Sequence, residues 1–540
     1  MTAQATRPYR PAQEETRDGF AQLLRAEWTK FRTVRGWVIG MVVAALVTVV
    51  LGLLVAGGGS IGCQTTPNST GKSGAACLPQ IPLGPGGEAV TDSFYFVHRP
   101  LDGNGSITVR VTSLTGLYSA HGGIAAGPNP QANFVSGVQP WSKAGIIVKA
   151  STRPGSAYAA MMVTGGHGVR MQYDYTHDTA GLPSAVPMAS PRWLRLTRSG
   201  DTLTGYESAD GTHWTQVGTA HLAGLPATVQ AGPFATSPNH DIVVSQSLGG
   251  ASSTGGPSLA TAAFDHVSLS GTRPDGTWSG DAVGGSSGGL PVPVSGFKHA
   301  DGRFTVTGSG DIVPLVTAAS GGLPTSTIEQ GLVGAFAGLI AVVVVAAMFI
   351  TAEYRRGMIR TTLAASPRRG RVLAAKAIVA GTVTFVAGLA AAILVVPLAT
   401  RLAHAKGSYV LPVTSLTELR VIAGTAALLA VAAVLALAIG TALRRSAGAV
   451  TAVIVVIVLP YILGTAAVLP VSAENWLLRV TPAAAFAVQQ SLPAYPQVTG
   501  SYTPTNGYFP LAPWAGFAVL CAWAALALGV AAVLLRRRDA

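Results

Sequence analysis

Three short patterns in the sequence contain residue types that could carry out chemistry. Residues 285–289, GSSGG, satisfy the G-x-S-x-G pattern of a nucleophilic serine. Residues 71–73, GKS, match the end of a phosphate-binding loop. Glu207 and Asp210 are two carboxylates close together in the sequence, and glycoside hydrolysis uses a pair of carboxylates. These patterns raise three possible functions for the chain: a serine hydrolase, a nucleotide-binding protein and a glycosidase.

None of the three patterns has the surroundings that its chemistry requires. A nucleophilic serine sits between a strand and a helix, whereas residues 285–289 are flanked by Gly and Pro, which favours a linker. A phosphate loop needs Gly at position 66, which is Thr66. Glu207 and Asp210 flank a turn and do not share a strand face. We therefore predict no catalytic residue, no metal site and no cofactor in this chain.

The composition indicates a membrane protein. Hydrophobic residues make up 49% of the 540 residues, charged residues only 11%, and the mean hydropathy is +0.43. Runs of about 20 apolar residues match the thickness of a bilayer of roughly 30 Å. We predict six spans, free of Asp, Glu, Lys and Arg in their interiors, at 37–56, 331–351, 376–399, 420–443, 448–470 and 514–535.

The distribution of charge predicts the orientation, because Lys and Arg near spans stay in the cytoplasm. With both termini inside, the cytoplasmic segments carry 19 basic and 6 acidic residues, and residues 57–328 outside carry 13 basic and 14 acidic. The whole net charge of +13 then lies on the inner side. Topology and anionic lipid explain the basic pI, so no nucleic-acid partner is predicted.

The cysteines fit this placement in a plasma membrane. Cys63 and Cys77 would lie outside, where a disulfide or two free thiols are both compatible with the sequence. Cys521 is alone in the last predicted span. The bias toward Ala, Gly, Arg and Pro is typical of a GC-rich bacterium.

The large external segment has the pattern of antiparallel β structure. Short runs such as RWLRLTR and TLTGYES alternate along the chain with Gly, Pro, Ser and Asp turns, and no helical period is present. We expect an external neck over 57–89, an all-β sandwich over 90–271, and a Gly/Ser/Pro-rich linker with extra strands over 272–328.

The succession of WSKAGIIVKAS, RWLRLTRSGDTLTGYESADGTHWTQVG and TAAFDHVSLSG resembles concanavalin A-like jelly rolls of the laminin G type. The resemblance implies that glycan binding is one use of the domain. Trp193, Tyr206 and Trp214 would be the glycan-facing aromatic residues, although scaffold positions explain them better.

Two further segments, both beside predicted spans, have informative sequence patterns. Residues 20–31 place apolar residues at helical spacing, which predicts an amphipathic helix on the inner leaflet within the cytoplasmic segment 1–36. Residues 353–376 form a short basic loop after the second span. Each arginine of that loop, taken alone, is explained by positive-inside anchoring.

Taken together, LLRAEWTKFRTVRG, TAEYRRGMIRTTLAASPRRGRVLAAK and the six-span layout resemble the type-2 permeases of ATP-binding-cassette (ABC) exporters, with ENWLLRVTPAAAFAVQQ where those permeases carry re-entrant helices. The resemblance covers about 20–56 and 329–538, with 329–538 as the main permease domain. It implies a separate ATPase subunit that holds ATP and Mg²⁺, and a second permease in a homodimer or heterodimer. The residues it assigns to contact with the ATPase are Glu27, Trp28, Lys30, Arg32, Glu353, Arg355, Arg356, Gly357, Thr361 and Thr362.

Two hypotheses remain after these observations. The first is the permease subunit of an ABC exporter with an inserted β-sandwich that binds glycan, substrate or a partner. The second is a membrane-tethered glycan-binding or glycan-processing protein. Charge-free spans argue against an ion-coupled transporter, which needs ionisable groups within the membrane. Glycine motifs at 36–40 and 334–338 permit close helix packing, within one chain or across a dimer.

Overall fold

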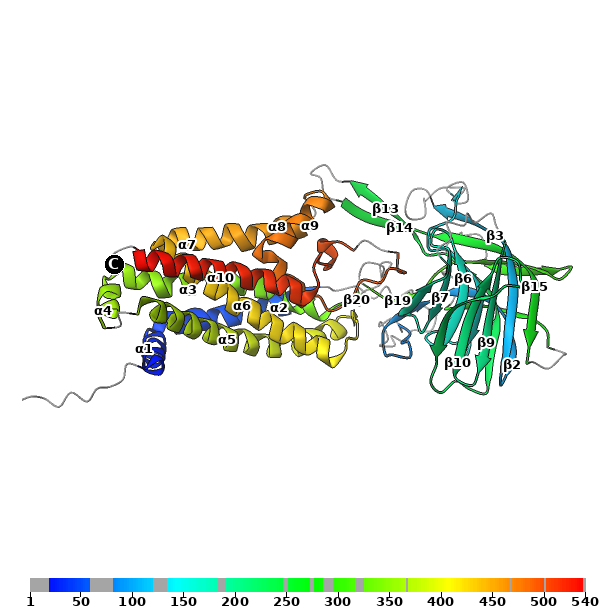
Figure 1. Ribbon diagram of the computed structural model, residues 1–540, viewed down its shortest axis with the longest axis horizontal. Coiled ribbons are helices and arrows are strands. Elements are labelled where there is room, and N and C mark those ends of the chain that lie inside the picture. The colour runs from blue at the N-terminus through cyan, green and yellow to red at the C-terminus, as the bar shows by residue number, and fades with distance from the viewer. Residues whose placement is uncertain are drawn as a thin grey trace, which may run out of the picture.

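The computed structural model describes residues 19–58, 81–119, 134–182, 191–245, 251–271, 276–284, 295–316, 325–365, 368–466, 468–499 and 502–537. The described chain forms a helical bundle at one end and a β-sandwich at the other (Figure 1). The G-x-S-x-G pattern at 285–289, the GKS pattern at 71–73, Cys63 and Cys77 lie outside the described residues.

Six helical segments of the described chain are long and apolar enough to cross a membrane. This confirms the predicted fold class, a polytopic helical membrane protein with an inserted β domain. The segments are α2 (Arg35–Gly58), η3 (Ile328–Leu332) with α3 (Gly334–Arg355), α5 (Arg369–Ala405), α6 (Ser415–Leu443), α7 (Ser446–Val453) with η4 (Ile454–Val458) and α8 (Leu459–Thr465), and α10 (Pro513–Arg537).

Five shorter helical segments of the described chain complete the bundle. Helix α1 (Phe20–Thr33) and helix α4 (Met358–Ala365) lie at the end far from the sandwich, beside the C-terminal end of α10 (Figure 1). Helix α9 (Val471–Val480), η5 (Pro482–Gln489) and η6 (Pro504–Asn506) lie between α8 and α10 in the chain. All eight residues of η5 are buried, so this segment packs inside the protein.

Helices α2 and α3 pack closely through glycine. A Cβ atom at Gly334 would overlap the carbonyl oxygen of Thr48, and one at Gly338 would overlap the hydroxyl of Thr48. A Cβ atom at Gly52 would overlap the carbonyl oxygen of Gly331. The 334–338 glycine motif is therefore used within one chain, which resolves one of the alternatives left by the sequence.

Gly334→Ala should destabilise the bundle by roughly 1–3 kcal/mol, because the added methyl group forces α2 and α3 apart. The thermal unfolding midpoint of the full chain in detergent would measure the loss. Gly36→Ala is the matched control, since nothing lies within 4 Å of a Cβ atom at Gly36. Equal midpoints for the two variants would show that α2 and α3 are not in close contact at Gly334.

Helix α5 differs from the expectation in one respect that matters for the site. It begins at Arg369 and not at the predicted start of the span, so Lys376 lies two turns inside a helix of 37 residues. The Lys376 side chain is fully buried. The helix therefore starts earlier than the predicted span, and Lys376, which the sequence placed at the edge of that span, is buried among the helices.

In the described residues the sandwich consists of two large antiparallel sheets. One has eight strands in the order β11-β10-β9-β3-β15-β18-β17, with β4 paired to β3, and the other has seven in the order β16-β2-β12-β5-β6-β7-β8. The strands of the first sheet are β3 (Gly105–Ser119), β4 (Phe134–Ser136), β9 (Arg192–Ser199), β10 (Thr202–Ser208), β11 (Thr215–His221), β15 (Ser258–Ser270), β17 (Gly296–Ala300) and β18 (Arg303–Gly308). Those of the second are β2 (Phe94–Asp102), β5 (Lys143–Lys149), β6 (Tyr158–Thr164), β7 (Val169–Tyr173), β8 (His177–Ala180), β12 (Thr228–Thr236) and β16 (Ser279–Val283).

The alternating sequence explains how the two sheets bury one face each. On β9, Leu194 and Leu196 are buried in the core, whereas Trp193 and Arg195 point to the other face. Strands β16 to β18 come from the segment assigned to a linker with extra strands, and they pair within the large sheets. A separate hairpin, β13 (His240–Ser245) and β14 (Ala251–Gly256), projects from the sandwich.

Two chain segments connect the sandwich to the bundle. Strand β1 (Val90–Asp92), where the chain enters the sandwich, pairs with β19 (Ile312–Pro314), where the chain leaves it. We call this two-stranded element the stalk. Two buried lysines at the ends of β5 hold it: Lys149 Nζ lies 2.7 Å from Asp92 Oδ2, and Lys143 Nζ lies 2.5 Å from Asp311 Oδ1.

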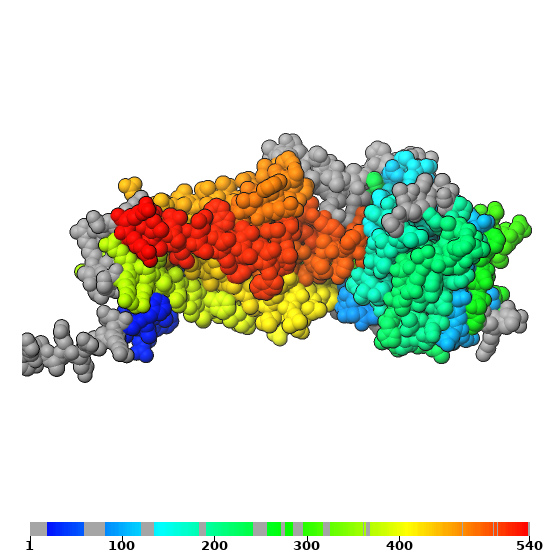
Figure 2. All heavy atoms as spheres, viewed as in Figure 1, coloured from blue at the N-terminus to red at the C-terminus, as the bar shows by residue number. Residues whose placement is uncertain are grey.

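Apolar contacts join the stalk to the bundle. Val313 and Val316 form a buried cluster with Val498 and Tyr508 from the segment between η5 and α10. Figure 2 shows this segment in orange-red between the bundle and the sandwich. Leu411 packs in a second cluster with Ala89 and Leu315. A short parallel bridge of β20 (Thr325–Ser326) and β21 (Tyr409–Val410) lies where the chain re-enters the bundle.

Candidate functional site

The candidate site lies at the end of the bundle that carries α1. Helix α1 is held there by aromatic packing, because Phe31 is buried against Phe349 of α3 at a ring distance of 5.4 Å. Trp37 of α2 contacts both rings, at 6.0 Å from Phe31 and 4.9 Å from Phe349. The N-terminal helix is thus anchored to two of the spanning helices by three aromatic side chains.

Next to these rings, four charged side chains from three helices form one network. Lys376 Nζ of α5 lies 2.5 Å from Glu27 Oε2 of α1 and 2.6 Å from Glu353 Oε1 of α3. Lys30 Nζ of α1 lies 2.7 Å from Glu27 Oε1 and 3.2 Å from Glu353 Oε1. We call Glu27, Lys30, Glu353 and Lys376 the charge network. It holds two positive and two negative groups and is neutral as a whole.

Because most of the network is buried, the stability of each charged group depends on its partners. The side chains of Glu27 and Lys376 are fully buried and that of Glu353 is 3% exposed, whereas Lys30 is 38% exposed. Removing a buried charge from water is costly unless a partner compensates for it. The ammonium group of Lys376 also lies 4.8 Å from the centre of the Phe349 ring, which stabilises it further.

Lys30 is the member of the network that reaches solvent and the neighbouring loop. Burial lowers the pKa of Lys30, but the hydrogen bond and charge of Glu27, together with Glu353, more than offset this and raise the pKa above its usual value. Lys30 therefore stays charged at neutral pH. Its Nζ also lies 3.4 Å from the hydroxyl of Thr362 in α4, a long contact that links the network to this helix.

The structure brings together four of the ten residues assigned to ATPase contact, namely Glu27, Lys30, Glu353 and Thr362. The others lie on the exposed surface of the same end: Trp28, Arg32, Arg355, Arg356, Gly357 and Thr361. Gly357 has a φ of +69°, which lets the chain turn sharply from α3 into α4. The roles of all ten residues stay predictions.

Sequence reasoning missed Lys376 as a site residue. The signal was present, since Lys376 is a lone cation with apolar residues on both sides in VLAAKAIVAG. An ionisable residue inside a spanning helix is by itself a reason to look for a partner. The pairing with Glu27, which lies 349 positions away in the sequence, could not be read from one sequence.

The three aromatic residues considered for glycan binding share the outer face of the eight-stranded sheet. Trp193 lies 5.7 Å from the guanidinium of Arg110, and Gly211 packs against its ring. The ring of Trp214 is covered by Arg195, whose guanidinium carbon lies 3.8 Å from the ring centre. Tyr206 pairs in register with Arg195. These contacts give Trp193 and Trp214 a packing role, and glycan binding stays a prediction.

A comparison of the sequence with known protein families identifies the membrane part. Residues 204–540 match the family described as ABC-2 family transporter protein, which is more than half of the chain. The chain belongs to the ABC-2 transporter family. This confirms the family resemblance, and the protein is a multi-pass membrane permease component of an ABC transporter.

Other comparisons add little to this assignment. No curated protein matches the sequence. A functionally unknown protein from Saccharomyces cerevisiae is similar in structure with 16% identity and a TM-score of 0.22, covering 36% of this chain and 84% of that chain. Scytalido-glutamic peptidase bound to a peptide-based transition state analog is similar with 8% identity and a TM-score of 0.22, covering 42% of this chain and 100% of that chain. These scores are too low to define a shared fold.

Membership in the ABC-2 family fits what the site can do. Among the described residues, no group of three or more His, Cys, Asp or Glu side chains is placed to hold a metal ion. The charge network joins α1, α3 and α5 and pairs every charge that it buries. Such an arrangement can transmit a displacement of α1 or α4 to the spanning helices.

Proposed function

We propose that this ABC-2 protein is the transmembrane subunit of an ATP-driven exporter that works as a dimer with two ATPase subunits. ATP and Mg²⁺ would be held by the ATPase and not by this chain. Both termini would face the cytoplasm and residues 57–328 would lie outside, which places the whole net charge of +13 on the inner side. The end of the bundle that carries α1 is then the side from which an ATPase can dock.

The observation that carries this proposal is the charge network. A motion can pass from a peripheral helix to spanning helices only through contacts that resist separation. Glu27 and Lys376 are buried and paired at 2.5 Å, so α1 cannot move away from α5 without exposing or unpairing both charges. Glu353 ties α3 to the same lysine at 2.6 Å. A push on α1 would therefore displace α3 and α5 together.

The surface around the network supplies the docking contacts. Trp28 is 46% exposed on α1, although it is a large aromatic residue. Arg355 and Arg356 are exposed where α3 ends, and Met358 is 42% exposed at the start of α4. Exposed aromatic and arginine side chains are the residues that protein interfaces favour. We assign them to contact with the ATPase, and we assign the buried network to transmission.

The sandwich would stand on the exit side of the exporter. The stalk and the apolar clusters fix it to the segment between η5 and α10, so it would follow movements of that segment. Whether it binds glycan, substrate or a partner is a separate question from the transport mechanism. The alternative function, a membrane-tethered glycan-binding or glycan-processing protein, has no use for a charge network at the opposite end of the bundle.

Lys30→Met should weaken the coupling between the subunits without separating them, because it removes the cation shared by α1, α3 and α4 but leaves the exposed arginines in place. The readout is the labelling rate of a cysteine introduced at exposed Leu416, near the sandwich end of α6, in a background lacking Cys63, Cys77 and Cys521. In the wild type this rate should change severalfold when the ATPase is trapped with ATP and vanadate. In Lys30→Met the change should be reduced but not abolished, because Lys376 still pairs with Glu27 and Glu353, and the ATPase should remain bound.

Arg25→Met serves as the matched control, since Arg25 is exposed on the same helix and outside the network. Its labelling rate should respond to nucleotide as in the wild type. A full nucleotide response in Lys30→Met would contradict the role of the network in transmission. A wild-type protein that shows no nucleotide response with a bound ATPase would contradict the transport mechanism itself.

A further inference from the structure

A pocket lined by uncharged polar and apolar residues lies at the sandwich end of the bundle. It has a volume of about 240 Å³ and is formed by the last turn of α2, by β20 and η3, by the last turns of α5 and by β21. Spanning helices α2 and α5 end beside it, at Gly58 and Ala405. The pocket therefore lies at the membrane surface on the side of the sandwich, at the depth of the lipid headgroups.

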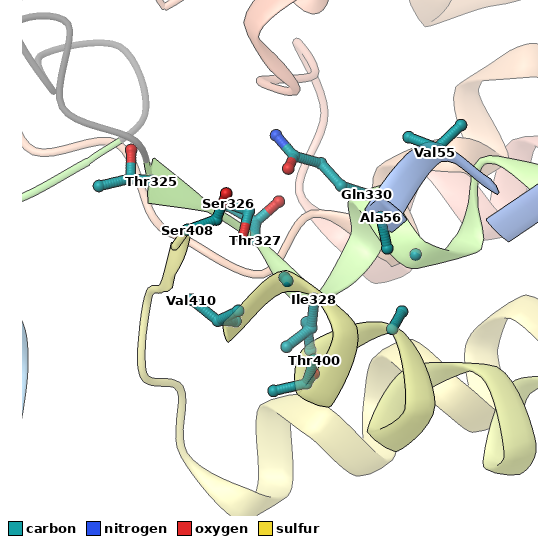
Figure 3. A pocket seen from close by; sticks show the side chains of 13 residues that line it. Val55, Ala56, Thr325, Ser326, Thr327, Ile328, Gln330, Thr400, Ser408 and Val410 are labelled. Atoms are coloured by element: carbon teal, nitrogen blue, oxygen red, sulfur yellow. The ribbon is translucent and has the colours of Figure 1, made fainter. Parts of the chain in front are cut away.

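The lining divides into a polar and an apolar side. The polar residues are Thr325, Ser326, Thr327, Gln330, Thr400 and Ser408. In Figure 3 the side chains of Ser326, Thr327 and Ser408 lie next to one another, and Val55 and Ala56 lie on the opposite side. Six of the thirteen lining residues thus carry a hydroxyl or carboxamide group, and the other seven, from α2, η3, α5 and β21, are apolar or glycine.

One hydroxyl group of the lining can accept a hydrogen bond from a ligand directly, and a second can do so once its side chain rotates. The Ser326 hydroxyl is buried and has no hydrogen-bond partner among the described residues. The Thr400 hydroxyl donates to the carbonyl oxygen of Val396 at 2.9 Å, so its own oxygen can still accept a hydrogen bond. A buried hydroxyl without a partner is rare in proteins, and rotation of the Ser326 side chain toward the pocket would let a bound polar molecule satisfy it.

The base of the pocket is closed. A Cβ atom at Gly331 would lie 2.8 Å from the Cβ of Ala399, and one at Gly52 would overlap the carbonyl oxygen of Gly331. The helices therefore meet without space between them at this depth. The pocket is therefore closed where η3 meets α2 and α5.

Charge and size restrict the occupant. None of the described lining residues is ionisable, so the pocket offers no cation to a phosphate group and no anion to an amine. Hydroxyl and carboxamide groups both donate and accept hydrogen bonds, which suits an uncharged molecule rich in hydroxyl groups. A volume of about 240 Å³ is smaller than that of most pockets for drug-sized ligands, at roughly 300–1,000 Å³, and suits a headgroup.

A surface for acyl chains adjoins the apolar side of the pocket. Val55 lines the pocket and is 48% exposed, and Leu51 and Leu54 on the same helix are 38% and 63% exposed. These side chains continue from the pocket toward the middle of the bilayer. An amphiphile could therefore place its headgroup in the recess and its chains along α2.

We propose that this pocket binds the sugar headgroup of a neutral glycolipid in the leaflet on the side of the sandwich. The hydroxyl-lined recess holds the sugar, and the exposed apolar side chains of α2 contact the acyl chains. The site needs neither the ATPase nor a direction of transport, so it stands apart from the proposed function.

The test uses the full chain in phosphatidylglycerol nanodiscs that contain a glycosyl diacylglycerol with a diazirine on its acyl chain. After photolysis, peptide mass spectrometry should find the label on α2 around 51–55. Excess unlabelled glycosyl diacylglycerol should abolish labelling, whereas additional phosphatidylglycerol or free soluble sugar should not. Thr400→Val and Gln330→Leu should each reduce labelling about fivefold, the loss expected for one hydrogen bond.

Thr465→Val is the matched control, because the Thr465 hydroxyl makes the same bond to its own helix, 2.8 Å from the carbonyl oxygen of Tyr461, and does not line the pocket. Gln330 is exposed, so its replacement leaves folding intact and keeps the test informative if Thr400→Val misfolds. Three results would overturn the proposal: equal competition by phosphatidylglycerol, competition by the free sugar alone, or unchanged labelling in Gln330→Leu.

Discussion

Lys376→Met should destabilise the ABC-2 protein by roughly 3–5 kcal/mol, because it leaves the buried carboxylates of Glu27 and Glu353 with Lys30 as their one remaining cation in the network. Two negative groups would then face one partly exposed positive group. The thermal unfolding midpoint of the full chain in detergent is the measurement. Lys406→Met is the matched control, since Lys406 is exposed at the other end of the same helix.

A second variant separates lost charge balance from lost packing. Adding Glu27→Gln to Lys376→Met restores a neutral network of Lys30 and Glu353. The double variant should therefore be more stable than Lys376→Met alone, although each change removes a hydrogen bond. A double variant that is less stable by the sum of the two single effects would show that the charges do not depend on one another.

Asp92→Asn should destabilise the sandwich by a similar amount, roughly 3–5 kcal/mol, because it leaves buried Lys149 without an anion. Asp92 Oδ2 accepts hydrogen bonds from Lys149 Nζ at 2.7 Å, from the Gly155 amide at 2.8 Å and from the Tyr175 hydroxyl at 2.7 Å. Burial, together with Asp92, raises the pKa of Tyr175, so its hydroxyl keeps the proton that it donates.

Asp92 lies on the stalk, so the loss should also loosen the connection to the bundle. The measurement is trypsin resistance of the sandwich in membrane vesicles at increasing urea concentration. Asp301→Asn is the control, because Asp301 is exposed in a turn where asparagine is equally suitable. Resistance that is the same in Asp92→Asn and in the control would contradict the structural role of the buried pair.

Much of the architecture could be predicted from the sequence because two simple patterns carry it. Apolar runs of bilayer length indicated the six spans, and alternation in runs such as RWLRLTR indicated the sandwich. Helix ends were less certain, since α5 continues through residues that hydropathy assigns to a basic loop. Lys376 was overlooked as a site residue for that reason, although Glu27, Lys30 and Glu353 were already candidates from the family resemblance.

Other features depend on contacts between distant residues and had no local signal. The docking of the sandwich rests on Val313, Val316, Val498 and Tyr508, which are ordinary apolar residues in their own segments. The uncharged pocket is formed by residues such as Thr325, Thr400 and Ser408, which come from separate places in the chain and share no sequence motif. A single sequence shows the periodicity of its helices and strands, but it does not show which distant residues are in contact.

The central claim, that an ATPase docks on the end of the bundle carrying α1, is tested most directly by affinity purification of the full chain from its native membrane. The wild type and Arg401→Glu, an exposed arginine at the opposite end, should both recover an ATP-hydrolysing subunit. Arg355→Glu with Arg356→Glu should lower that recovery roughly tenfold or more. A monodisperse wild-type protein with no ATP-hydrolysing partner would contradict the account.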